Sequence, residues 1–143
     1  KPNVVTYTTL LHAYARLGNI DAAERGMEMM LANHIMPNVV SYSALMQACV
    51  KSGDMDRAEK WFNEMRAQGV KPNAVSYSSV LDACAKRGDW QRAERWLVAM
   101  GEDGVPPTVV CFNNVINACA RGGRPDRAEA WLREVMGEDA LLA

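Results

Sequence analysis

The segment "PNVVSYS" at residues 37–43 decides the fold, because close copies of it occur three more times in the chain. The copies are "PNVVTYT" at 2–8, "PNAVSYS" at 72–78 and "PTVVCFN" at 107–113, so each begins 35 residues after the one before. A fixed period without insertions is typical of solenoid proteins, in which one supersecondary unit stacks on the next. The four segments therefore predict four stacked units.

Each unit has the pattern of two helices. In the first unit, apolar residues at helical spacing predict a helix over Val4–Leu17 and a second over Ile20–Asn33. Asn3 is a suitable N-cap, Gly18 can end the first helix in the left-handed conformation, and Pro125 fits the first position of the last helix. Two antiparallel helices cannot bury their apolar faces alone. The sequence predicts an all-α fold, an α-solenoid of four helix-turn-helix repeats.

Composition excludes several other classes. The net charge of −1 gives no global indication of a polyanionic partner, and no apolar run approaches the roughly 18 residues of a membrane span. The cysteines form no CxxC pair, and three of them share the period, so buried reduced thiols are predicted: Cys49, Cys84, Cys111 and Cys119.

Three tryptophans occupy the same position in the second helix of successive repeats and are predicted to lie in the core between repeats: Trp61, Trp96 and Trp131.

No catalytic or metal site is predicted. A zinc deaminase needs an H-x-E motif and a C-x-x-C pair, and neither of the two histidines, His12 and His34, fits the first. No glycine-rich phosphate loop or G-x-S-x-G motif occurs, and the aspartates near helix starts are explained by the helix dipole. We therefore expect no catalytic residues, no metal and no cofactor.

A second pattern lies on the face of the first helix opposite the apolar stripe. Val5, Thr8, His12 and Arg16 fall within about 80° of one another on a helix, so this face is predicted to point away from the core. Each further repeat again places a valine, a small hydrogen-bonding residue, a polar residue and a cation there. Structural explanations exist for each column: a local apolar contact for the valine, the helix dipole for the cation, and N-caps for Asn38 and Asn73.

The geometry of stacked helices favours a ligand for this face. Packed helices lie roughly 8–10 Å apart, and a flat group that contacts two valines at about 3.5–4 Å needs a gap of roughly 7–8 Å. A nucleobase fits such a gap, the hydroxyl or amide one turn further can reach its edge, and the cation can meet the phosphate. This arrangement is expected of a modular reader of single strands.

The chain closely resembles the pentatricopeptide repeat family in its 35-residue form. The likeness rests on "VVTYTTLLHAYARLG", "VSYSALMQACVKSGD", the "A-E-x-x-x-x-E-M" pattern and "GVKPN". It implies repeats at 4–38, 39–73, 74–108 and 109–143, a right-handed superhelix, and sequence-specific binding of single-stranded RNA with one base per repeat. Family members mostly serve mitochondria and plastids. Residues 1–3 would close an absent upstream repeat, so the chain is expected to be cut from something longer.

The resemblance also assigns roles to residues. The second residue of each repeat would stack on bases: Val5, Val40, Val75 and Val110. The fifth and last residues would select them, in the pairs Thr8 with Asn38, Ser43 with Asn73, Ser78 with Thr108, and Asn113 with Ala143. The cations would face phosphates: Arg16, Lys51, Lys86 and Arg121. His12 is expected to contact RNA from the same face.

These pairs predict the site 5′-A-A-purine-pyrimidine-3′, in the parallel polarity of the family. An amide both donates and accepts, so Asn38 and Asn73 match the edges of adenine or cytosine, and the family's correlation of Ser or Thr with purines then selects adenine. Thr108 is unusual and leaves a purine preference. Asn113 favours a pyrimidine, but the tail "MGEDALLA" departs from the pattern and Ala143 offers no polar side chain.

Two further partners stay open. A protein or peptide could occupy the groove of a helical-repeat scaffold, and the near-neutral charge favours that alternative, since RNA binders are often basic. Against it, a peptide groove gives no reason for a hydroxyl or amide beside the valine in every repeat. Apolar ends without capping repeats also predict self-association.

Overall fold

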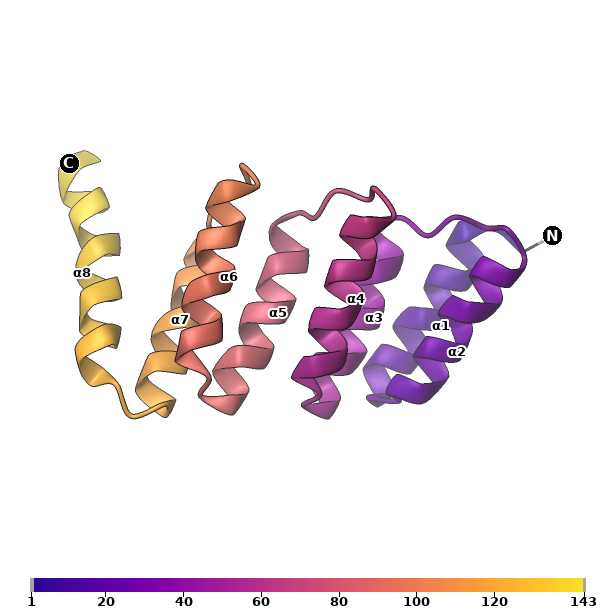
Figure 1. Ribbon diagram of the computed structural model, residues 1–143, viewed down its shortest axis with the longest axis horizontal. Coiled ribbons are helices and arrows are strands. Elements are labelled where there is room, and N and C mark those ends of the chain that lie inside the picture. Colours follow the sequence, from indigo (N-terminus) through magenta and orange to yellow (C-terminus); the bar gives the residue numbers. More distant parts are fainter. Residues whose placement is uncertain (1, 143) are drawn as a thin grey trace. The chain divides into compact units, whose positions relative to one another are not determined.

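A computed structural model describes the backbone of residues 2–142 and the side chains of residues 2–137. This part of the chain contains helices and no strands (Figure 1). The helices are α1 (Val4–Leu17), α2 (Ile20–Ala32), α3 (Val39–Ser52), α4 (Met55–Ala67), α5 (Ala74–Arg87), α6 (Trp90–Glu102), α7 (Val109–Arg121) and α8 (Pro125–Leu142). The prediction of an all-α chain of paired helices is confirmed.

Local sequence explains where the helices begin and end. The Asn3 side chain accepts a hydrogen bond from Thr6 N, and the Thr6 side chain returns one to the Asn3 backbone, which forms a capping box at the start of α1. Gly18 ends α1 with φ of 67°, in the left-handed conformation that glycine adopts without steric cost. Pro125 is the first residue of α8, as predicted. The second helix ends one residue earlier than predicted, at Ala32, because the chain turns through Asn33.

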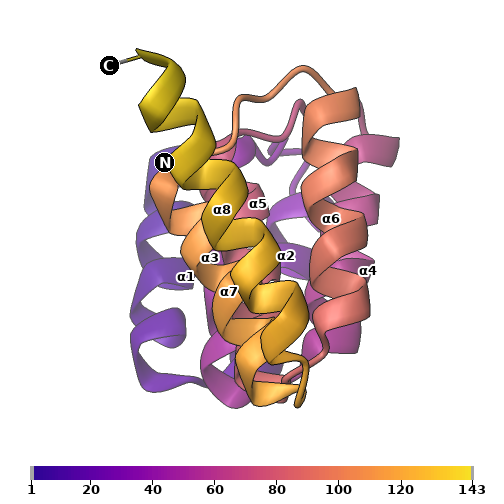
Figure 2. The ribbon, with the colours of Figure 1, turned by 90° about the vertical axis from the view of Figure 1, so that its left-hand side faces the viewer.

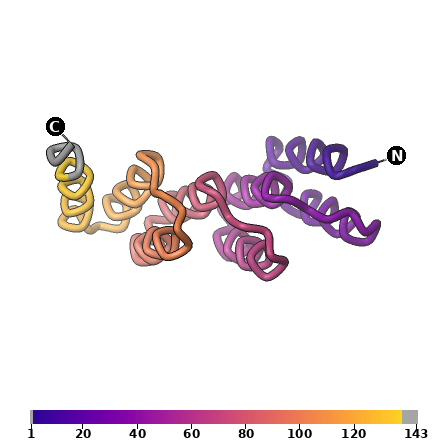
Figure 3. The backbone as a smooth tube through the Cα atoms, turned by 90° about the horizontal axis from the view of Figure 1, so that it is seen from above, coloured from indigo at the N-terminus to yellow at the C-terminus, as the bar shows by residue number. Residues whose placement is uncertain are grey.

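Contacts divide the chain into two units, and the first unit comprises residues up to Val80. In this unit α1 packs along α3 in one layer, and α2 and α4 lie in a second layer (Figures 2 and 3). Tyr42, Leu45 and Phe62 are fully buried between the layers. The Phe62 ring meets the edge of Tyr77 at 4.9 Å between centroids. Each such side chain contributes about 1.5–3 kcal/mol through burial.

Polar contacts join the second helices of the first unit. Trp61 of α4 is 7% exposed, and its Nε1 donates a 2.7 Å hydrogen bond to Glu24 of α2. Arg57 also reaches Glu24, at 3.3 Å, and Asp21, at 2.9 Å. Trp61 therefore lies in the core between two helix pairs, as predicted, whereas Trp96 and Trp131 of the same column are half-buried.

The second unit begins at Leu81 and contains the end of α5 with α6, α7 and α8. In this unit α6 packs on α7 and α7 packs on α8, and Leu97, Met100 and Val115 are buried. The contact of the first unit is repeated here, because Glu94 accepts a 2.7 Å hydrogen bond from Trp131 Nε1 and pairs with Arg127 at 2.7 Å. Both units thus use one carboxylate to hold an indole and a guanidinium.

The cysteines are buried free thiols, as predicted: Cys49, Cys84, Cys111 and Cys119. Burial raises the pKa of Cys49 to about 12, and the nearby carboxylates of Glu24 and Asp54 add to the shift. Burial also raises the pKa of Cys119. Among the described residues, no helix is long and apolar enough to cross a membrane.

Candidate functional site

The four valines of the predicted site are exposed near the start of the first helix of each repeat. The exposed fractions are 67% for Val5, 48% for Val40, 52% for Val75 and 57% for Val110. Each is followed two residues later by an aromatic residue, which in the first three copies is buried: Tyr7, Tyr42 and Tyr77. The helix therefore anchors itself by the aromatic ring and leaves the valine methyl groups open to a ligand.

The small polar residues of the same face are placed differently from the sequence prediction. Thr8 is 9% exposed and Ser43 is 6% exposed, so the prediction that this whole face points away from the core is wrong at these two positions. Thr8 is covered because α3 packs along α1, and its hydroxyl lies 3.0 Å from the Ser41 hydroxyl of α3. Ser43 belongs to α3 itself, which α1, α2 and α4 surround. Ser78 is half-buried and Asn113 is exposed.

The last residues of the repeats are N-caps of the following helix. Asn38 Oδ1 accepts a 3.0 Å hydrogen bond from Ser41 N, and Asn73 Oδ1 accepts one of 3.0 Å from Ser76 N. Thr108 caps α7 through Oγ1, which accepts from Cys111 N at 3.4 Å. Asn38, Asn73 and Thr108 are nevertheless exposed, so capping leaves part of each side chain accessible. Ala143 lies outside the described residues.

Sequence reasoning missed the residue that connects the two predicted base-selecting side chains. Ser41 Oγ lies 3.0 Å from Thr8 Oγ1 and also donates a 3.0 Å hydrogen bond to Asn38 Oδ1. Thr8 of α1 and Asn38, the N-cap of α3, are therefore linked through one hydroxyl. The periodic sequence held a signal for this residue, a column of hydroxyls at Thr6, Ser41 and Ser76 that becomes Cys111 in the fourth repeat.

The four cations are exposed at the other end of the first helices: Arg16, Lys51, Lys86 and Arg121. Two of them have partners within the protein. Lys51 Nζ donates a hydrogen bond to the backbone carbonyl of Arg16, and Lys86 lies 3.6 Å from Asp82, one turn earlier in α5. His12 is half-buried one turn before Arg16. A phosphate would compete with these internal contacts for Lys51 and Lys86.

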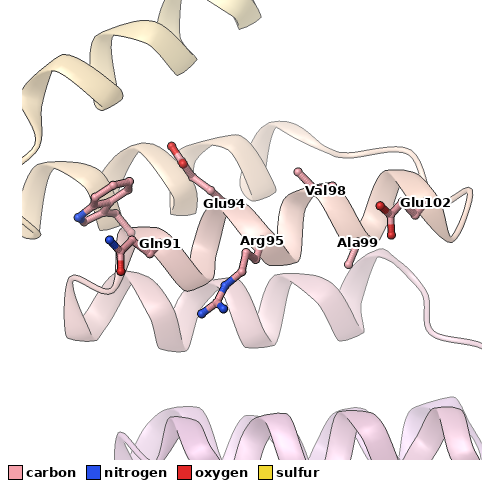
Figure 4. A pocket seen from close by; sticks show the side chains of 7 residues that line it. Gln91, Glu94, Arg95, Val98, Ala99 and Glu102 are labelled. Atoms are coloured by element: carbon pink, nitrogen blue, oxygen red, sulfur yellow. The ribbon is translucent and has the colours of Figure 1, made fainter.

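A groove of about 580 Å³ runs along α6 and is unrelated to the predicted site. Figure 4 shows the side chains that line it, among them Glu94, Arg95 and Val98. The Glu94 carboxylate already accepts hydrogen bonds from Arg127 and Trp131. Within the described residues no cluster of His, Cys, Asp and Glu could hold a metal ion.

Family profiles match nearly the whole chain. Residues 37–86 and 72–121 match the PPR repeat family, residues 1–52 match the pentatricopeptide repeat domain, and residues 110–139 match the PPR repeat. Among curated protein sequences, none is a significant match.

Solved structures of similar fold include the pentatricopeptide repeat protein PPR10 from maize, which is 25% identical with a TM-score of 0.82 over 99% of this chain. The complex of PPR10 with an 18-nt psaJ RNA element is 24% identical with a TM-score of 0.85 over 97% of this chain. The chain spans only 20% of the length of PPR10.

A third similar structure is the PPR domain of Arabidopsis thaliana protein-only RNase P 1 in complex with tRNA. It is 20% identical with a TM-score of 0.76, over 92% of this chain and 70% of that domain. These likenesses confirm the prediction of an all-α solenoid of helical repeats.

Proposed function

The chain belongs to the pentatricopeptide repeat family, and from this premise we propose that it binds single-stranded RNA with one base per repeat. The repeats of the proposal are 4–38, 39–73, 74–108 and 109–143. Two of the similar structures are RNA complexes, one with an 18-nt element and one with tRNA, which supports this class of partner. The proposal concerns binding alone and assigns no catalytic step to these residues.

The proposal rests on two exposed valines, Val5 and Val40, and on the polar side chains of Thr8 and Asn38. The exposed Val5 of one repeat and the exposed Val40 of the next provide apolar surfaces. Thr8 follows Val5 by three residues, Asn38 precedes Val40 by two, and the Ser41 hydroxyl links the two side chains. A base between the two valines would bury its faces on methyl groups and meet polar atoms at its edge. A ligand without flat rings would meet the polar atoms but would not stack between the two valines.

The proposed RNA sequence is 5′-A-A-purine-pyrimidine-3′. The first two positions rest on Asn38 and Asn73, the third on Ser78 with Thr108, and the fourth on Asn113. Stacking contributes about 1–3 kcal/mol per base on aromatic platforms, and valine belongs at the lower end. Four bases therefore give micromolar or weaker binding.

The exposed cations add a salt-dependent contribution. A phosphate that binds Lys51 replaces the contact of its ammonium group with the Arg16 carbonyl, so only the difference between the two contacts adds to affinity. Each neutralised phosphate on a single strand lowers the slope of log K against log salt by about 0.7. With four cations, binding should weaken clearly as salt rises.

A titration of labelled oligonucleotides tests the proposal. The chain should bind 5′-AAAU-3′ more tightly than oligouridylate of the same length, and Val40→Asp together with Val75→Asp should abolish binding while the helical circular dichroism persists. Val98→Asp serves as a control for the introduced charge, because Val98 is 57% exposed on α6 and is not among the proposed site residues. Equal indifference to both oligonucleotides would favour the peptide-binding scaffold instead.

Self-association belongs to the same set of proposals. Leu10 is 37% exposed at the outer face of the first repeat, whereas Leu45, one repeat later in the same column, is fully buried. Leu10 lines a groove of about 390 Å³ with Tyr14 and Met29. A second copy could cover this apolar face. Sedimentation that is independent of concentration would rule this out.

The family resemblance supports one further proposal, a location in mitochondria or plastids. Imaging of the tagged protein tests it, and a uniform cytosolic signal would contradict it.

A further inference from the structure

We propose that Ser41 fixes the hydrogen-bonding polarity of the first base site, so that Asn38 offers only donors to a base and Thr8 offers only an acceptor. The inference rests on the proposed function, since it concerns how the same site distinguishes bases. Ser41 is fully buried in α3 and cannot reach a ligand itself. It is a positioning residue that acts through Asn38 and Thr8.

The orientation of the Asn38 amide follows from its partners. The backbone N–H of Ser41 can only donate, so the Asn38 atom 3.0 Å from it must be the oxygen, Oδ1. The same oxygen lies 3.0 Å from Ser41 Oγ. Both lone-pair directions of Oδ1 are thus used inside the protein. The Nδ2 group of Asn38, at an exposed residue, keeps two N–H donors for a ligand.

The direction of the bond between Thr8 and Ser41 follows by counting protons. A serine hydroxyl has one hydrogen, and Ser41 gives it to Asn38 Oδ1. Ser41 Oγ also accepts from Asn38 N at 3.3 Å. Either oxygen could donate in the 3.0 Å contact between Thr8 and Ser41, and with the Ser41 hydrogen on Asn38 Oδ1 we infer that Thr8 is the donor. Its hydrogen points into the protein, and the lone pairs of this 9% exposed side chain are all that it offers to a ligand.

A donor beside an acceptor recognises one class of base edge. Adenine presents an amino donor next to the N1 acceptor, and cytosine presents an amino donor next to N3. We assign Asn38 to the ring nitrogen of the base and Thr8 to its exocyclic group. In this register guanine and uracil place a ring N–H against the Asn38 donor and a carbonyl against the Thr8 acceptor. The site therefore accepts adenine or cytosine and rejects the reversed edge of guanine, uracil or hypoxanthine.

The contacts between the serine and the asparagine cap occur a second time in the chain, and the following boundary departs from them. Ser76 donates to Asn73 Oδ1 at 3.0 Å and accepts from Asn73 N at 3.3 Å, as Ser41 does with Asn38. At the next boundary Cys111 replaces the serine, and Thr108 Oγ1 donates to its sulfur at 3.3 Å. Because a thiol is a weak hydrogen-bonding group, base discrimination should be weakest there.

The test replaces adenine by inosine at the first position, with the 143-residue chain and the oligonucleotides 5′-AAAU-3′ and 5′-IAAU-3′. Hypoxanthine keeps the purine rings but reverses the donor and acceptor of the edge. The wild-type chain should prefer adenine about tenfold, the discrimination of a good pair of base contacts. In Ser41→Ala the Thr8 hydroxyl is free to turn and donate to the carbonyl, so the preference should fall to about twofold.

Two variants separate this effect from general loss of structure. Ser41→Thr keeps the hydroxyl, as at Thr6, and should retain the preference. Ser52→Ala removes a serine from the last turn of the same helix, where its hydroxyl bonds Ala48 O, and should also retain it. If Ser41→Ala does not fold, Ser41→Cys, which imitates Cys111, must show the reduced preference.

The outcomes are distinguishable. A wild-type chain that binds neither oligonucleotide overturns the proposed function, and this inference with it. A wild-type chain that prefers adenine, together with a Ser41→Ala or Ser41→Cys variant that prefers it equally, overturns the role of Ser41 alone.

Discussion

The carboxylate of Glu24 accepts a 2.7 Å hydrogen bond from the indole Nε1 of Trp61, which lies in the next helix pair. The same geometry occurs in the second unit, where Glu94 accepts a 2.7 Å hydrogen bond from Trp131. In both places an arginine of the later helix shares the carboxylate: Arg57 at 3.3 Å and Arg127 at 2.7 Å. In each unit, one carboxylate thus binds both an indole N–H and a guanidinium of the next helix pair.

Glu24→Ala should destabilise the chain by about 1–3 kcal/mol, because it leaves the part-buried indole N–H without its acceptor and removes one partner of Arg57. The free energy of unfolding in urea measures this loss. Glu28→Ala, one turn later on an exposed position of α2, should change it by no more than about 0.5 kcal/mol. Equal effects of the two substitutions would show that the Glu24 contacts do not stabilise the interface.

The helix ends could be predicted because short-range chemistry sets them. An asparagine cap and a left-handed glycine act within one turn, so the helix over Val4–Leu17 could be predicted from the sequence. The predicted end of α2 is one residue too late, because the turn after this helix runs through Asn33 and His34. The later repeats have glycine in place of His34, and the first repeat lacks that signal for the end of the helix.

The candidate site was less predictable because it depends on neighbouring helices. A helical wheel treats α1 alone, and on it Thr8 lies opposite the apolar stripe. In the structure α3 packs along α1 and buries Thr8 against Ser41. The role of Ser41 could not follow from spacing within one repeat, because its hydroxyl links a side chain of the preceding repeat to the cap of its own helix.

His34→Gly should stabilise the chain by about 0.5–1 kcal/mol. His34 has φ of 59°, whereas the residues at the same repeat position, Gly69 and Gly104, have φ of 77° and 74°. The left-handed conformation costs an L-residue about 1–2 kcal/mol, and the greater freedom of glycine in the unfolded chain offsets part of the gain. Thermal and urea unfolding measure the change. His12→Gly, within α1, should instead destabilise by about 1 kcal/mol, and a loss of stability in both variants would contradict this account of His34.

Removal of the hydroxyl should have different consequences at Tyr7 and Tyr42. The Tyr7 hydroxyl accepts a 3.0 Å hydrogen bond from Asn33 Nδ2, whereas the buried Tyr42 hydroxyl has no hydrogen-bond partner among the described residues. Tyr7→Phe should cost about 0.5–1.5 kcal/mol, and Tyr42→Phe should be neutral or stabilising, because it removes an unpaired buried group. Urea titrations of both variants measure the free energy of unfolding, and a larger loss of stability for Tyr42→Phe would refute the prediction.

The stability of the chain should fall in alkaline solution partly through Cys49. Burial raises the pKa of this thiol to about 12 from the ordinary value of 9.0. Above about pH 9 the unfolded thiol has lost its proton while the folded thiol keeps it, so the unfolded state binds fewer protons and the free energy of unfolding decreases with pH. The contribution of Cys49 is therefore fully present below about pH 9 and is lost progressively as the pH rises toward about 12.

Cys49→Ala isolates this contribution, because lysines and tyrosines titrate alike in both proteins. The variant should be less stable at pH 7, since it lacks a buried sulfur, but its free energy of unfolding should decline less steeply between pH 8 and pH 10 than that of the wild-type chain. Urea titrations across that range measure both slopes. Parallel slopes would mean that the thiol ionises equally easily in the folded and unfolded chains, which full burial of Cys49 beside Glu24 and Asp54 does not allow.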